Sequence, residues 1–137
     1  MDPQLAVSVS PKERWAGRII AALVLLFLLS DSIGHIAEMK GVVEWSTTLG
    51  LAVNSNVGVG ITLLVCMILY VVPRTSVLGA IVITGYLGGA VAINFRVGNA
   101  LFGHTLLPAA VGFLLWLSLY LREPRLRILI PLKKICD

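Results

Sequence analysis

Residues 56–95 read NVGVGITLLVCMILYVVPRTSVLGAIVITGYLGGAVAINF, and Arg74 is the only Asp, Glu, Lys or Arg among them. A helix rises 1.5 Å per residue, so roughly 20 apolar residues cross a hydrocarbon core of about 30 Å. This stretch holds two such runs, at about 56–72 and 76–95. Pro73 separates them because it cannot donate a helical hydrogen bond. The stretch therefore predicts two transmembrane helices joined by a tight corner, with Thr75 or Ser76 capping the second.

Two further apolar windows lie outside this pair. The first covers about residues 15–34, and it spans fully if Arg18 snorkels to one interface and Asp31 lies near the other. The second covers about residues 101–121. The sequence thus predicts an all-α integral membrane protein. We expect one domain over residues 1–137, an antiparallel bundle of four transmembrane helices with a basic cytoplasmic tail at 122–137.

The composition excludes other classes of protein. Of 137 residues, 58% are hydrophobic and 13% are charged, which is too little charge to cover the surface of a small water-soluble domain. The mean hydropathy of +0.94 also excludes a disordered chain, because disordered chains have low hydrophobicity. The net charge of +4 comes from scattered residues, so it does not predict binding to nucleic acid.

Residues 31–54 are too polar to span a membrane and too apolar for a free loop. We expect an interfacial helix or a re-entrant segment there, with Ile33, Ile36, Ala37 and Val43 facing lipid. Aromatic residues near the ends of the spans are expected to anchor the chain at the membrane interfaces. These are Trp15, Trp45, Tyr70, Trp116 and Tyr120.

The basic residues predict the orientation of the chain. Four spans place the amino end, the Pro73 corner and the carboxyl tail on one side, with only Lys40 and Arg96 on the other. The positive-inside rule then puts both termini in the cytoplasm. The basic residues on that side are Lys12, Arg14, Arg18, Arg74, Arg122, Arg125, Arg127, Lys133 and Lys134. The tail is expected to lie on anionic lipid, or alternatively to dock a partner.

Polar and ionisable residues gather at the outer end of this topology. Such groups are expensive in lipid, so each needs a partner or a site. An Asp31–Arg96 pair could line a pocket for a ligand head group, with Arg96 or His104 donating to a carbonyl. Alternatively, Arg96 caps the third helix and Asp31 merely neutralises it. The candidate ligand-binding residues are Asp31, His35, Tyr86, Asn94, Arg96 and His104.

The third predicted span is rich in small residues, including the spacing Gly85-x-x-x-Gly89. Small residues let helices approach closely in lipid, so packing inside the bundle is the first interpretation. The alternatives are that these residues form a homodimer interface or leave room for a flat ligand. Thr84 and Tyr86 are expected to form hydrogen bonds between helices.

No recognised catalytic or metal-binding motif is present in the sequence. It has no glycine-rich phosphate loop, no H-E-x-x-H, no metal-spaced cysteine pairs and no nucleophile elbow. His35 and His104 are too few to predict a haem. We therefore predict neither catalytic nor metal-ligating residues.

Two long motifs resemble the DoxX-like family of small bacterial four-helix membrane proteins. They are PRTSVLGAIVITGYLGGA at 73–90 and WLSLYLREPRLRILIPL at 116–132. The resemblance implies the four-helix fold and the bacterial inner membrane. DoxX itself is named as a membrane subunit of a thiosulfate:quinone oxidoreductase. Many such proteins carry a histidine just before the arginine, whereas this chain reads AINFRVG at 92–98, with Asn94, which does not titrate, before Arg96.

Three functions are compatible with these features. The leading hypothesis is an accessory, non-catalytic membrane protein that binds a hydrophobic molecule, quinone or isoprenoid-like, between its helices near the outer leaflet. The second is a membrane subunit of a quinone-linked oxidoreductase, which needs a redox partner protein. The third is a scaffold for other membrane proteins.

Overall fold

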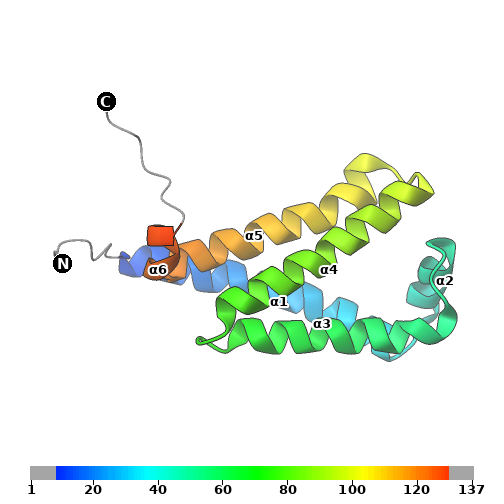
Figure 1. The fold of residues 1–137 in the computed structure, drawn as a ribbon, viewed down its shortest axis with the longest axis horizontal. Helices are drawn as coiled ribbons and strands as arrows, with labels where there is room; N and C mark the ends of the chain where they lie inside the picture. Colours follow the sequence, from blue (N-terminus) through cyan, green and yellow to red (C-terminus); the bar gives the residue numbers. More distant parts are fainter. Residues whose placement is uncertain (1–8, 130–137) are drawn as a thin grey trace.

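A computed structural model describes residues 9–129 of the chain, and every regular element in that range is a helix. Figure 1 shows their order along the chain. The α-helices are α1 Pro11–Ile36, α2 Lys40–Thr48, α3 Asn56–Val71, α4 Ser76–Val97, α5 Leu106–Arg122 and α6 Pro124–Leu129. A 3₁₀ turn, Val53–Ser55, precedes α3, and a π-helical turn, Leu101–Thr105, leads into α5.

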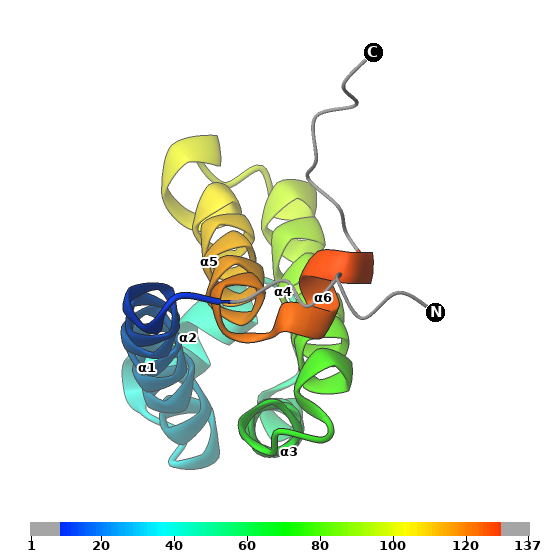
Figure 2. The same cartoon turned by 90° about the vertical axis from the view of Figure 1, so that its left-hand side faces the viewer.

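The four longest helices pack side by side in a ring. α1 packs on α3 and α5, and α4 packs on the same two helices, as the end-on view in Figure 2 shows. The start of α1, the α3–α4 corner and α6 lie at one end of the molecule, and α2 and the α4–α5 turn lie at the other (Figure 1). The chain therefore has two distinct ends, which we call the α6 end and the α2 end.

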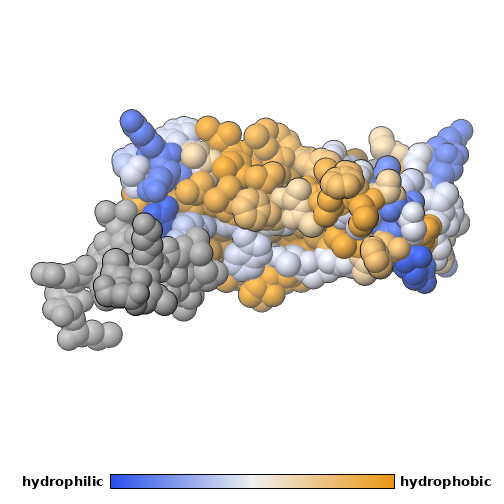
Figure 3. Space-filling view, turned by 90° about the horizontal axis from the view of Figure 1, so that it is seen from above, coloured by the Kyte–Doolittle hydropathy of each residue, from blue (hydrophilic) through white to orange (hydrophobic). Residues whose placement is uncertain are grey.

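Among residues 9–129, three helices are long and apolar enough to cross a membrane: α1, α4 and the continuous helix Leu101–Arg122. α3 is also apolar but has 16 residues, which gives a length of about 24 Å at 1.5 Å per residue. Figure 3 shows an apolar belt over the middle of the molecule and hydrophilic residues toward its ends. This distribution matches a bilayer with polar interfaces on both sides.

The interior and the outer surface of the ring are both apolar. Leu63, Ile83 and Leu115 are fully buried between the helices, whereas Phe95 and Phe113 are each 68% exposed. Large apolar side chains that cover most of the outside are unfavourable in water but not in lipid. The packing therefore supports the exclusion of a water-soluble protein.

Three glycines mark the places where helices approach most closely. A Cβ on Gly17 would contact the backbone of Ser118 in α5, one on Gly60 would contact Ser32 in α1, and one on Gly79 would contact Tyr70 in α3. In contrast, a Cβ on Gly85 or Gly89 would meet no atom of another helix within 4 Å. The interpretation of the Gly85-x-x-x-Gly89 spacing as bundle packing is therefore wrong for this pair.

The first helix is longer than the sequence predicts. Residues 31–36 continue α1 rather than beginning an outer segment, because polar side chains there find partners inside the bundle. Ser32 is fully buried and donates to the carbonyl of Gly60 in α3 at 2.8 Å. The separate outer segment is reduced to residues 37–55, whose central helix α2 lies across the end of the ring (Figure 1).

Two predicted roles near the Pro73 corner are wrong. Thr75 is the residue before α4, but its hydroxyl donates to the carbonyl of Leu69 at 2.7 Å, and Ser76 donates to Pro73, so neither side chain caps α4. Tyr70 is only 1% exposed and is therefore not an interface anchor. The hydroxyls of Thr75 and Ser76 instead satisfy carbonyl groups near the end of α3 and in the corner that follows it.

Candidate ligand-binding site

A cavity of about 450 Å³ opens at the α2 end of the molecule. Its walls come from α1, α2, α4 and the start of α5, with Val59 contributed by α3. Most of the lining is aliphatic or aromatic, and Gly85 and Gly89 of α4 leave part of its wall without side chains. The polar residues among the lining are Asp31, His35, Trp45, Ser46, Tyr86, Asn94 and His104.

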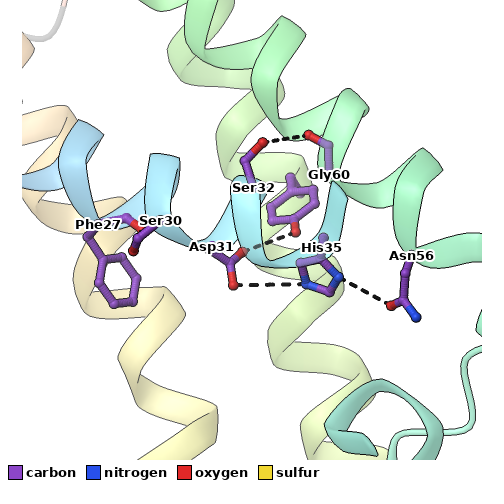
Figure 4. Close-up of polar contacts among 8 residues, drawn as sticks. Phe27, Ser30, Asp31, Ser32, His35, Asn56 and Gly60 are labelled. Carbon is purple, nitrogen blue, oxygen red and sulfur yellow. Dashed lines mark hydrogen bonds and ion pairs between the residues drawn. The ribbon is translucent and has the colours of Figure 1, made fainter. Parts of the chain in front are cut away.

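Asp31 is at the centre of the polar contacts of this cavity. The hydroxyl of Tyr86 donates to Asp31 Oδ2 in a long hydrogen bond of 3.5 Å, which links α4 to α1. His35 lies one turn after Asp31 on α1, and its Nε2 is 3.9 Å from Asp31 Oδ1 (Figure 4). The predicted interhelical bond of Tyr86 is confirmed. The one predicted for Thr84 is confirmed as well, since the indole of Trp116 donates to Thr84 at 2.8 Å.

Asn56 extends this group of contacts into α3. Its side chain is fully buried at the first position of the helix, and its Oδ1 is 3.3 Å from His35 Nδ1 (Figure 4). Because an amide oxygen only accepts, His35 Nδ1 is the donor. No sequence signal selects Asn56 as a site residue, since an asparagine at the edge of an apolar run is also typical of a span boundary.

Asn94 lines the cavity while it also completes the end of α4. Its Nδ2 donates to the carbonyl of Ala90 at 2.9 Å, and its Oδ1 accepts from Asn99 Nδ2 at 2.8 Å. Gly98 then ends α4 with φ 78°, a left-handed conformation that glycine adopts without strain. Asn94 is buried, so its amide is a fixed polar group in the wall.

Arg96 does not line the cavity, and the predicted Asp31–Arg96 pair is wrong. The guanidinium donates to the carbonyl of Leu49 at 3.2 Å, and Leu49 is the residue that ends α2. The alternative is supported in part, because Arg96 lies in the last turn of α4, where a cation complements the dipole of that helix. Arg96 also places its positive charge at the carboxyl end of α2, where a cation complements the helix dipole.

The outer wall of the cavity is formed by two aromatic rings. His104, on the π-helical turn, lies against Trp45 of α2 with ring centroids 4.5 Å apart and planes tilted by 30°. Trp45 therefore contributes to the cavity wall, a role that was not predicted for it. Within residues 9–129, no three His, Cys, Asp or Glu side chains come close enough together to hold a metal ion.

A second, wholly apolar groove of about 540 Å³ lies between α1 and α3. Leu25, Leu29, Leu64 and Met67 are among its lining residues, and it has no polar side chain to orient a head group. Such a surface matches the acyl chain of a lipid.

The α6 end holds its polar groups in a different arrangement. The hydroxyl of Tyr70 bonds to Ser118 Oγ at 2.6 Å and accepts from Arg122 at 2.8 Å. Arg127 lies 3.3 Å from Glu13, which fastens α6 to the start of α1. Arg122 and Arg127 therefore contact protein groups, which the tail prediction did not foresee. Lys133 and Lys134 lie outside the described residues.

The helical ring, its apolar outer belt and its polar ends define a helical integral membrane protein, here with a cavity at one end. A model of the DoxX-like family matches residues 19–118. The chain belongs to the DoxX-like family, as its motifs predicted. No curated protein and no solved structure matches it.

Proposed function

We propose that this protein binds a small hydrophobic molecule, quinone or isoprenoid-like, in the cavity at the α2 end, and that its role is accessory rather than catalytic. The observation that carries the proposal is the cavity itself, which combines an apolar lining with polar groups around Asp31. Its volume of about 450 Å³ is within the range of roughly 300–1,000 Å³ that small-molecule sites occupy.

The proposal includes a topology with four membrane crossings, α1, α3, α4 and α5. The basic residues at the α6 end place that end and both termini in the cytoplasm, in the inner membrane of a bacterium. The cavity then lies near the outer leaflet, and Phe27 and Leu28 mark its inner part. A ligand with a long apolar chain could remain partly in the bilayer while its head enters the cavity.

Filling the cavity tests the proposal directly. Gly85→Leu and Gly89→Leu place side chains into open space on the cavity wall, and no neighbouring atom obstructs their Cβ. Gly88→Leu is the matched control, because Gly88 is in the same helix with equally open surroundings but does not line the cavity. Each protein is purified in native-membrane nanodiscs, and the bound small molecules are extracted and quantified by mass spectrometry.

We expect wild type and Gly88→Leu to retain a specific hydrophobic molecule that is reduced at least tenfold in Gly85→Leu and Gly89→Leu. The proposal is wrong if wild type retains nothing beyond bulk lipid. It is also wrong if all four proteins retain the same molecule in the same amount.

A further inference from the structure

We infer that the molecule bound in this cavity carries an uncharged hydroxyl group that donates a hydrogen bond to Asp31, as an alkylphenol or a quinol-type molecule does. This inference rests on the proposed function and specifies the ligand class of the same site. It changes the expectation from the sequence, in which Arg96 or His104 donates to a ligand carbonyl.

The charges around the cavity exclude an anionic head group. Asp31 contributes a carboxylate, and none of the described residues that line the cavity is a lysine or an arginine. Arg96 lies two residues after the lining residue Asn94, but its guanidinium donates to the carbonyl of Leu49 and does not line the cavity. A phosphate or carboxylate head would therefore meet a like charge with no strong cation to compensate it.

The hydrogen bonds around Asp31 leave acceptors rather than donors. Tyr86 uses its single proton on Asp31, so its oxygen retains only lone pairs for a ligand. His35 uses Nδ1 on Asn56 Oδ1, and its Nε2 lies 3.9 Å from Asp31 Oδ1, beyond hydrogen-bond distance. The carboxylate of Asp31 is 42% exposed and has further lone pairs available. A carbonyl group placed here would face other acceptors, whereas a hydroxyl would find a charged acceptor.

The remaining donors belong to other parts of the wall. They are the second amide hydrogen of Asn94 at the end of α4, the indole N–H of Trp45 and the hydroxyl of Ser46 on α2, and a ring N–H of His104 on the π-helical turn. They can serve a second polar atom of the ligand but are not part of the Asp31 group.

An ammonium head fits less well than a hydroxyl. The His35 ring already lies 3.9 Å from the Asp31 carboxylate and occupies part of the space beside it. Most of the other lining side chains are apolar, including Leu28, Leu87 and Ile93. Transfer of an ammonium group into such surroundings carries a desolvation penalty that an uncharged hydroxyl avoids.

Four probes that share one tail test the head group. They are para-hexylphenol, para-hexylanisole, which lacks the donor, and para-hexylbenzoate, which is an anion; para-hexylbenzylamine supplies the ammonium comparison. Each is equilibrated with the full-length protein in lipid nanodiscs and quantified by mass spectrometry. Empty nanodiscs give the amount that merely partitions into lipid.

We expect wild type to bind the phenol about tenfold more tightly than the anisole, which is the discrimination that one hydrogen bond to a charged group supplies. In Asp31→Leu the preference falls to within about twofold, while binding of the anisole shows that the cavity is intact. Glu44→Leu is the control, because it removes an exposed carboxylate at the same end of the molecule that does not line the cavity. It should retain the tenfold preference.

The results separate this inference from the proposed function. If wild type binds phenol and anisole equally and Gly85→Leu abolishes both, the hydroxyl head is wrong and the binding site stands. Tightest binding of the benzoate or the benzylamine also overturns the hydroxyl head. If no probe binds above empty nanodiscs, or if Gly85→Leu changes nothing, the proposed function fails and the inference fails with it.

Discussion

Tyr70 connects α3 to α5 through one hydroxyl group. It lies on α3, bonds to Ser118 of α5, and accepts from Arg122 at the end of the same helix. The guanidinium of Arg122 also lies 5.4 Å from the centre of the Tyr70 ring, and Gly17 lets α1 approach the same place. A buried hydroxyl that both donates and accepts in this way fixes the relative positions of its partners.

Tyr70→Phe removes this oxygen, so Ser118 and Arg122 each lose one partner and keep one other hydrogen bond. We expect the free energy of unfolding to fall by about 1–3 kcal/mol, the usual contribution of a hydrogen bond to a charged group. Thermal unfolding in a mild detergent measures the change. Tyr120→Phe is the control, since Arg127 contacts the backbone oxygen and ring face of Tyr120, which phenylalanine keeps. Equal stability of Tyr70→Phe and wild type would contradict the assignment.

The residues around the cavity show which parts of a site follow from topology. Asp31, His35, Asn94 and His104 were selected because four alternating spans bring them to one end, whereas Tyr86 was noted for its hydroxyl within an apolar span; all five line the cavity. Their role in ligand binding stays a prediction. Arg96 shares that end but turns to Leu49. Its contact depends on where the nine residues of α2 fold back, which charge spacing does not specify.

At the level of the element, α4 presents different faces at its two ends. Near its start, Gly79 lies against the backbone of Tyr70 and sets the closeness of the α3–α4 corner. Farther along, Gly85 and Gly89 leave open space that becomes cavity wall. Glycine therefore allows close helix packing in one turn of α4 and leaves room for the cavity in another.

Two alanine substitutions in α4 should have opposite effects. Gly79→Ala forces a methyl group onto the α3 backbone and should reduce the free energy of unfolding by about 1–3 kcal/mol, as overpacking does. Gly88→Ala meets open space and should be neutral or stabilising by up to about 1 kcal/mol, because alanine favours the helix. Unfolding in the same detergent measures both. A stable Gly79→Ala variant would show that the corner can relax.

The boundaries of the helices were predicted with uneven success. Proline and charge spacing placed α3 and α4 within two residues of their observed ends, since both signals act on the backbone locally. The end of α1 was also predicted within two residues, but the surroundings of its last turns were not, because Asp31 and Ser32 suggest a water interface. Their partners, Tyr86 and Gly60, lie far away in the chain, so only the folded ring shows that these polar groups are satisfied inside it.

At the scale of the whole molecule, the proposed topology places the two ends of the ring on opposite sides of the membrane. Single cysteines replacing Lys12 or Arg125 at the α6 end, or Lys40 at the α2 end, report this when Cys66 and Cys136 are changed to alanine. An impermeant maleimide added to intact cells should label the cysteine at position 40 and spare those at 12 and 125 until the membrane is opened. Labelling of positions 12 and 125 on different sides would contradict an even number of crossings.

The ring also has one short member. As a membrane crossing, α3 extends about 24 Å, less than the hydrocarbon thickness of about 30 Å, whereas α1 has 26 residues. In the proposed topology with four crossings, lipids beside α3 shorten or tilt to cover it, so the annulus of lipid is thinner on that flank than on the other. Neighbouring proteins with similarly short helices can share the boundary of this thinner bilayer. The deformation therefore favours their gathering beside α3 without any direct polar contact.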